Sequence, residues 1–94
     1  MPAQTIQITN RHGLHARPAA LFVQVASRYR AEVFVSKRSE GEDASFEANG
    51  KSIMGVMMLQ AESGAFLTIR ADGDDANDAV RALATLVESR FGEE

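Results

Sequence analysis

The sequence of 94 residues contains no cysteine and no long apolar run. The lack of cysteine excludes disulfide bonds and metal sites built on thiolates. No apolar run approaches the roughly 20 residues that a membrane-spanning helix needs. The first residues lack the basic flank and the apolar stretch of a signal peptide. These absences predict a cytoplasmic protein that does not insert into a membrane.

Basic residues are also not in excess. The sequence has 13 acidic and 10 basic residues, and its formal net charge is −3. Non-specific binding of nucleic acids depends on a basic surface, so we expect no nucleic-acid partner. The hydrophobic content of 45% and the charged content of 24% are ordinary for a globular protein. The length suits a single domain over residues 1–94.

Four segments have the pattern of strands with one buried face. They are Thr5–Thr9, Glu32–Ser36, Ser45–Ala48 and Phe66–Arg70. The polar and acidic stretch from residue 38 to residue 44 is expected to form the hairpin loop between the second and third strands.

Three segments carry apolar side chains at helical spacing. The first begins near Pro18, which suits a first helical turn, and ends near Arg30. The second covers Ser52–Leu59 with Ser52 as its N-cap, and the third follows a cap at Asp74 or Asp75. The predicted order of elements is therefore βαββαβα.

A sheet with one apolar face needs a cover, which amphipathic helices can supply. The rule that crossovers are right-handed favours an antiparallel split-βαβ arrangement over a doubly wound parallel one. The predicted fold is α+β, an open-faced β-sandwich in which a four-stranded antiparallel sheet is covered on one face by three helices. The pattern leaves the order of the strands open.

The clearest chemical pattern is a histidine that lies just before a helix start. His15 precedes Pro18, and the free N–H groups and dipole of a helix terminus attract anions. Arg17 adds a positive charge and planar donors that suit phosphate oxygens. The same field disfavours the imidazolium ion and keeps the ring neutral and nucleophilic near neutral pH. These residues indicate a histidine that attacks a phosphoryl donor and then carries the phosphate.

Simpler interpretations of the same residues exist. A lone histidine or arginine near a helix start is often an ordinary surface residue. His12 and His15 have the H-x-x-H spacing of some metal sites, but no cysteine or nearby carboxylate completes a set of ligands. We therefore expect no metal and no other cofactor, and His12 is interpreted as a polar loop residue.

Two motifs resemble those of one protein family. The run Gly13–Ala19 (GLHARPA) is similar to the phosphorylation motif of HPr proteins, the histidine phosphocarriers of the bacterial phosphoenolpyruvate:sugar phosphotransferase system. The run Gly50–Leu59 (GKSIMGVMML) is similar to the regulatory-serine segment of that family. Both motifs occur in the order typical of the family, so the resemblance covers essentially the whole chain.

The resemblance implies that Enzyme I phosphorylates His15 on Nδ1, with phosphoenolpyruvate as the original donor. It further implies that the phosphoryl group passes to the IIA domains of sugar permeases and that Arg17 assists the phosphate. Such a protein is a phosphoryl carrier rather than an enzyme in the usual sense. We also expect it to be a monomer.

The resemblance assigns two further roles. Ser52 matches the serine that HPr kinase/phosphorylase modifies in catabolite regulation, which adds this kinase and a catabolite regulator as candidate partners. Serine is also favoured there as a helix N-cap, so both roles stay open. Ala20, Ile53, Met54 and Met57 match the apolar surface on which HPr proteins dock their partners. Because methionine stripes are also typical of cores, we expect the short helix to present one face to the core and the other to partner proteins.

The chain departs from the family pattern in one place. The separation of His15 from Ser52 is longer than usual, with the extra residues in the acidic stretch 40–43. The run Gly50–Leu59 also resembles the nitrogen-related branch of the family. Three alternatives to a sugar-branch phosphocarrier stay open. The first is a nitrogen-branch phosphocarrier with the same chemistry, and the second is a corepressor-type module that acts through Ser52. The third is a metal-binding domain built on His12 and His15.

Overall fold

The computed structural model describes residues 1–39, 41, 43 and 46–93, and it has the predicted order of elements. A short 3-10 helix, η1, follows the last α-helix. The strands are β1 (Ala3–Gln7), β2 (Glu32–Arg38), β3 (Ala48–Asn49) and β4 (Phe66–Asp72). The helices are α1 (Ala16–Ala26), α2 (Ile53–Met57), α3 (Ala76–Glu88) and η1 (Arg90–Gly92).

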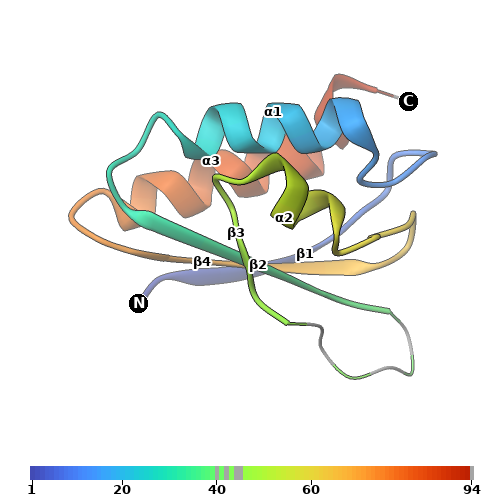
Figure 1. The fold of residues 1–94 in the computed structure, drawn as a ribbon, viewed down its shortest axis with the longest axis horizontal. Helices are drawn as coiled ribbons and strands as arrows, with labels where there is room; N and C mark the ends of the chain where they lie inside the picture. Colours follow the sequence, from blue (N-terminus) through green and yellow to red (C-terminus); the bar gives the residue numbers. More distant parts are fainter. Residues whose placement is uncertain (40, 42, 44–45, 94) are drawn as a thin grey trace.

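The strands form a four-stranded sheet in the order β1-β4-β2-β3, and every neighbouring pair is antiparallel. The three α-helices lie on one side of this sheet (Figure 1). The predicted α+β open-faced sandwich is confirmed. No helix among the described residues is long and apolar enough to cross a membrane.

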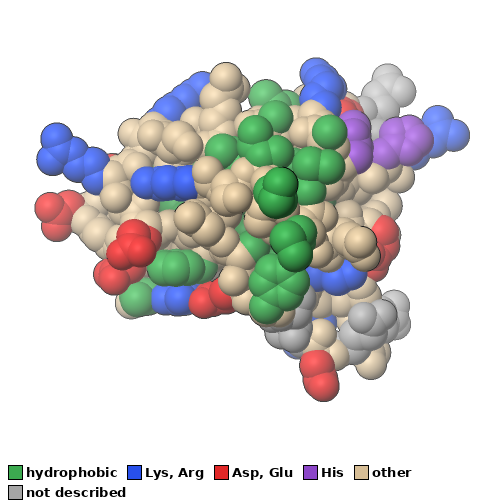
Figure 2. All heavy atoms as spheres, in the orientation of Figure 1, with side chains coloured by type: hydrophobic (Ala, Val, Ile, Leu, Met, Phe, Trp, Pro, Cys, Tyr) green, Lys and Arg blue, Asp and Glu red, His purple; other side chains and the backbone are tan. Residues whose placement is uncertain are grey.

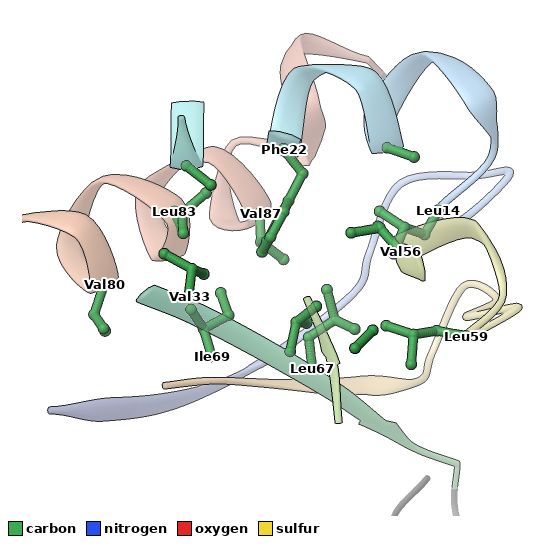
Figure 3. Close-up of a cluster of buried hydrophobic side chains, with 14 of the residues drawn as sticks. Leu14, Phe22, Val33, Val56, Leu59, Leu67, Ile69, Val80, Leu83 and Val87 are labelled. Atoms are coloured by element: carbon green, nitrogen blue, oxygen red, sulfur yellow. The ribbon is translucent and has the colours of Figure 1, made fainter. Parts of the chain in front are cut away.

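The core lies between the sheet and the helices (Figure 3). Phe22 of α1 and Leu83 of α3 are fully buried and face the inward side chains of the sheet. Burial of each large apolar side chain contributes about 1.5–3 kcal/mol. Leu14, which is 4% exposed, belongs to the same buried cluster as Val56 of α2. The residue that precedes His15 is therefore anchored in the core.

Several boundaries differ from the predicted ones because long-range contacts set them. The first strand begins at Ala3 rather than Thr5, since pairing with β4 already starts there. Helix α1 starts at Ala16, before Pro18, and ends at Ala26 rather than near residue 30. Its end is early because the backbone N–H groups of residues 30 and 31 bond to the carboxylate of Asp75, at 2.9 and 2.8 Å. These two hydrogen bonds end the helical conformation and direct the backbone towards β2.

The second half of the chain shows similar shifts. Helix α2 ends at Met57 rather than Leu59, whereas β4 continues beyond Arg70. The third strand is only Ala48–Asn49. Glu40 and residues 42 and 44 of the expected loop, and Ser45 at the start of the expected strand, lie outside the described residues.

The C-terminal turn η1 was not expected from the sequence. Arg90 and Phe91 both have positive φ, 59° and 55°, which is rare for residues other than glycine. The side chain of Phe91 is only 1% exposed, so its burial in the core compensates for the unfavourable backbone conformation. This turn redirects the chain after α3 towards the start of α1.

Candidate functional site

His15 is the N-cap of α1, where the backbone changes from an extended to a helical conformation (φ −78°, ψ −171°). Its carbonyl accepts the first helical hydrogen bond, from the N–H of Ala19 at 2.9 Å. Its imidazole makes no capping bond and is 40% exposed. Within the described part of the chain, the N–H groups of Ala16 and Arg17 have no acceptor, and Pro18 has no N–H. A histidine thus lies beside two free donors at the positive end of a helix, an arrangement that suits an anion.

The loop before α1 is held against the segment that follows α2. The N–H of Leu14 donates to the carbonyl of Ala61 at 2.8 Å. Gly13 has φ 68°, and a Cβ at this position would lie 2.6 Å from the same carbonyl oxygen. No side chain fits there, and only glycine adopts this conformation at little cost. The close approach fixes the position of His15 relative to α2.

The carboxylate of Glu93 contacts both predicted site residues. Its Oε2 lies 3.2 Å from Nε2 of His15 and 3.1 Å from Nη1 of Arg17. The side chain of Glu93 is 15% exposed, whereas that of Arg17 is 65% exposed. The structure therefore brings His15 and Arg17 together around a shared acidic group, and leaves most of the arginine accessible to a ligand.

Asn10 is the buried member of the cluster that Glu93 forms with His15 and Arg17. It is fully buried, and its Nδ2 donates to the carbonyl of Gly13 at 2.7 Å and to Oε1 of Glu93 at 3.1 Å. Burial raises the pKa of Glu93, but hydrogen bonds from His15, Asn10 and Arg17 outweigh it and leave this pKa below its ordinary value. Glu93 is consequently ionised at neutral pH.

His12 is exposed and its ring is a neighbour of the His15 ring. The centroids of the two rings are 5.9 Å apart, and the rings meet edge to face at 87°. Figure 2 shows the two histidines side by side at one end of the molecule, with basic side chains on either side of them. Among the described residues, no group of three or more His, Cys, Asp or Glu side chains is arranged to hold a metal ion.

Ser52 is the N-cap of α2, as the sequence predicts. Its Oγ accepts a hydrogen bond from the backbone N–H of Gly55 at 3.1 Å. Ser52 is half-buried rather than enclosed in the core. The geometry is therefore compatible with both the capping and the regulatory role.

Helix α2 presents opposite faces to the core and to solvent. Val56 is fully buried, whereas Met54 is 74% exposed. We define the apolar patch as the exposed residues Ile53, Met54, Met57 and Met58, which line a shallow groove together with Gln60. Ala20 on the neighbouring helix α1 is exposed as well. In Figure 2 apolar side chains extend over α1 and α2 next to the histidines.

Sequence reasoning missed two residues of the cluster around His15 and one residue of the apolar patch. Asn10 looks like a loop residue in the sequence, Glu93 looks like a terminal charge, and Met58 was not assigned to the patch. One signal for Glu93 was available, since the aromatic Phe91 close after an amphipathic helix indicates a C-terminal segment that folds back on the core. Nothing local to residue 93 indicates which side chain it meets.

Comparisons with known proteins agree with this geometry. A family model described as the "PTS HPr component phosphorylation site" matches residues 2–89, where PTS denotes the phosphotransferase system. The phosphocarrier protein HPr of Neisseria meningitidis is 44% identical over 93 residues, which cover 99% of this chain and 98% of that protein. The crystal structure of HPr from Thermoanaerobacter tengcongensis has a TM-score of 0.86 and 46% identity, and the match covers 100% of this chain and 99% of that one.

A further relative bears on oligomeric state and regulation. The structure of Crh, a catabolite repression protein of Bacillus subtilis, is 39% identical with a TM-score of 0.69, and the match covers 96% of this chain and 97% of that one. It is described as a domain-swapped, intertwined dimer, so the monomer expected here stays a prediction. The likeness fits a family that takes part in carbon catabolite regulation. The chain belongs to the HPr family of phosphocarrier proteins of the phosphotransferase system.

Proposed function

We propose that this chain, acting as one domain, accepts a phosphoryl group on Nδ1 of His15 from phosphorylated Enzyme I and passes it to the IIA domains of sugar permeases. The observation that supports this best is the position of His15 as N-cap of α1, beside two free N–H groups and the Arg17 guanidinium. These donors match the oxygens of a phosphoryl group bound to the ring. Transfer of such a group needs positioning and charge stabilisation more than covalent help.

The proposed step is a simple displacement at phosphorus. The lone pair of Nδ1 forms a bond to phosphorus, while the bond from phosphorus to Enzyme I breaks and leaves its electron pair on Enzyme I. Transfer to a IIA domain repeats the displacement with His15 as the leaving group. The chain returns to its starting state after each cycle, as expected of a carrier.

Incubation with phosphoenolpyruvate and purified Enzyme I tests this function. We expect a single phosphate, labile in acid and stable in alkali, that appears faster with the sugar-type Enzyme I than with the nitrogen-type enzyme. Faster transfer from the nitrogen-type enzyme would place the chain in the nitrogen branch. No phosphate with either enzyme would overturn the proposal.

We further propose that the apolar patch and Ala20 dock Enzyme I beside His15. Met54→Asp should raise the KM for Enzyme I by at least about fivefold, because it puts a charge into the centre of an apolar contact. Met54→Leu, which keeps an apolar side chain, should transfer at nearly the wild-type rate. Steady-state transfer assays with varied Enzyme I measure both variants, and an unchanged KM for Met54→Asp would remove the patch from the interface.

Ser52 is proposed as a regulatory site for HPr kinase/phosphorylase, with a catabolite regulator as reader of the phosphoserine. Ser52→Asp should fold normally but accept phosphate more slowly, chiefly through a raised KM, because the added charge borders the apolar patch. Ser52→Ala should transfer rapidly yet lose on the order of 1 kcal/mol of stability with its cap. Thermal melts and transfer kinetics of both variants separate these effects. Wild-type kinetics for Ser52→Asp would leave Ser52 as a structural cap, and would also weigh against a corepressor module that acts through it.

A further inference from the structure

The hydrogen-bond partner of His15 determines which ring nitrogen can react. Nε2 lies 3.2 Å from Oε2 and 3.3 Å from Oε1 of Glu93. An ionised carboxylate only accepts hydrogen bonds, so the hydrogen of the neutral ring is on Nε2. The lone pair is then on Nδ1. This is the nitrogen to which the proposed function assigns the phosphoryl group.

Glu93 is itself held by two donors, one buried and one exposed. Asn10 is fully buried and donates to Oε1, while Arg17 donates to Oε2, each at 3.1 Å. The Oδ1 atom of Asn10 has no partner among the described residues. Its buried amide is therefore used entirely as a donor, towards Glu93 and the carbonyl of Gly13. A buried amide with an unsatisfied oxygen is unfavourable, and it persists here where it orients a carboxylate on the histidine.

The backbone before Glu93 also departs from ordinary geometry. Two consecutive non-glycine residues, Arg90 and Phe91, adopt left-handed conformations, and the buried Phe91 ring anchors the turn. Unfavourable conformations of this kind persist only where the surrounding structure over-determines them. Here the turn places one carboxylate against a side chain 78 residues earlier in the sequence.

We propose that Glu93 is a positioning residue for His15, which it orients through the Nε2–H so that Nδ1 keeps its lone pair for phosphorus. When Nδ1 bonds to phosphorus, the ring keeps its Nε2 hydrogen and gains positive charge. The adjacent carboxylate compensates that charge, in the way that a buried aspartate supports a catalytic histidine in hydrolases. The inference rests on the proposed function and adds to it the group that orients the acceptor.

Three variants separate the two properties of the Glu93 side chain, its hydrogen-bond acceptor and its negative charge. Glu93→Ala removes both, whereas Glu93→Gln keeps a carbonyl oxygen that can accept from Nε2 but lacks the charge. Glu88→Gln is the matched control, because it makes the same change in net charge at an exposed position at the end of α3. The ring nitrogens of His15 are observed by ¹⁵N NMR in the free protein, and transfer from Enzyme I is measured separately.

In the wild type we expect the hydrogen on Nε2 alone, and in Glu93→Ala a shift towards the mixed tautomers of a free imidazole. The maximal transfer rate of Glu93→Ala should fall roughly tenfold with little change in the KM for Enzyme I. Glu93→Gln should restore the tautomer and part of the rate, and Glu88→Gln should match the wild type. An unchanged tautomer and rate in Glu93→Ala would overturn the positioning role but leave phosphorylation of His15 intact. A wild-type chain that takes no phosphate would overturn the proposed function, whatever its tautomer.

Discussion

His15→Ala is expected to abolish phosphorylation by Enzyme I, because alanine offers no lone pair to phosphorus. His12→Ala should retain most of the activity. The ring of His12 touches that of His15 only edge to face, at a centroid distance of 5.9 Å, and the described contacts of Glu93 and Arg17 do not include it. Phosphate incorporation per chain, followed by its stability in acid and alkali, measures both variants.

The fold should survive loss of His15. Its side chain makes no capping bond to α1, so the helix loses no hydrogen bond when the ring is removed. A thermal melt of His15→Ala close to that of the wild type would show that inactivity is a chemical effect and not unfolding. If His12→Ala were the inactive variant and His15→Ala the active one, the assignment of the acceptor would be wrong.

Arg17→Ala should slow transfer roughly 10- to 100-fold, which corresponds to the loss of a charge-assisted contact worth about 1.5–3 kcal/mol. Stability should change by less than ~0.5 kcal/mol, because the Arg17 side chain is 65% exposed. Arg17→Lys should recover only part of the rate, since lysine lacks the planar pair of donors. Single-turnover transfer and thermal melts give the two quantities.

Arg81→Ala provides the control for net charge, as Arg81 is an exposed residue of α3. This variant should transfer at the wild-type rate. Equal rates for Arg17→Ala and the wild type would remove Arg17 from the site. A similar loss in Arg81→Ala would instead indicate a general effect of the charge of the protein on its encounter with Enzyme I.

Much of the fold could be predicted because its elements depend on short-range patterns. The alternation in β2 and β4 and the helical spacing in α3 place apolar side chains on one face, and only a covered sheet buries all of them. The pairing β1-β4-β2-β3 could not be derived in this way, since several orders bury the same faces. The early end of α1 likewise depends on the distant carboxylate of Asp75.

The same distinction between local patterns and long-range contacts applies to the site. The sequence by itself determined that His15 and Arg17 lie at one helix start, because neighbours within a single turn share that terminus whatever the rest of the chain does. It also determined Ser52 as the cap of α2, for the same local reason. Only the tertiary structure decided that Glu93 meets His15, because a contact between residues so far apart depends on where α3 ends and on the burial of Phe91. A carboxylate near the end of a chain has no local sequence pattern that predicts its partner, so the packing of the core determines which residue it meets.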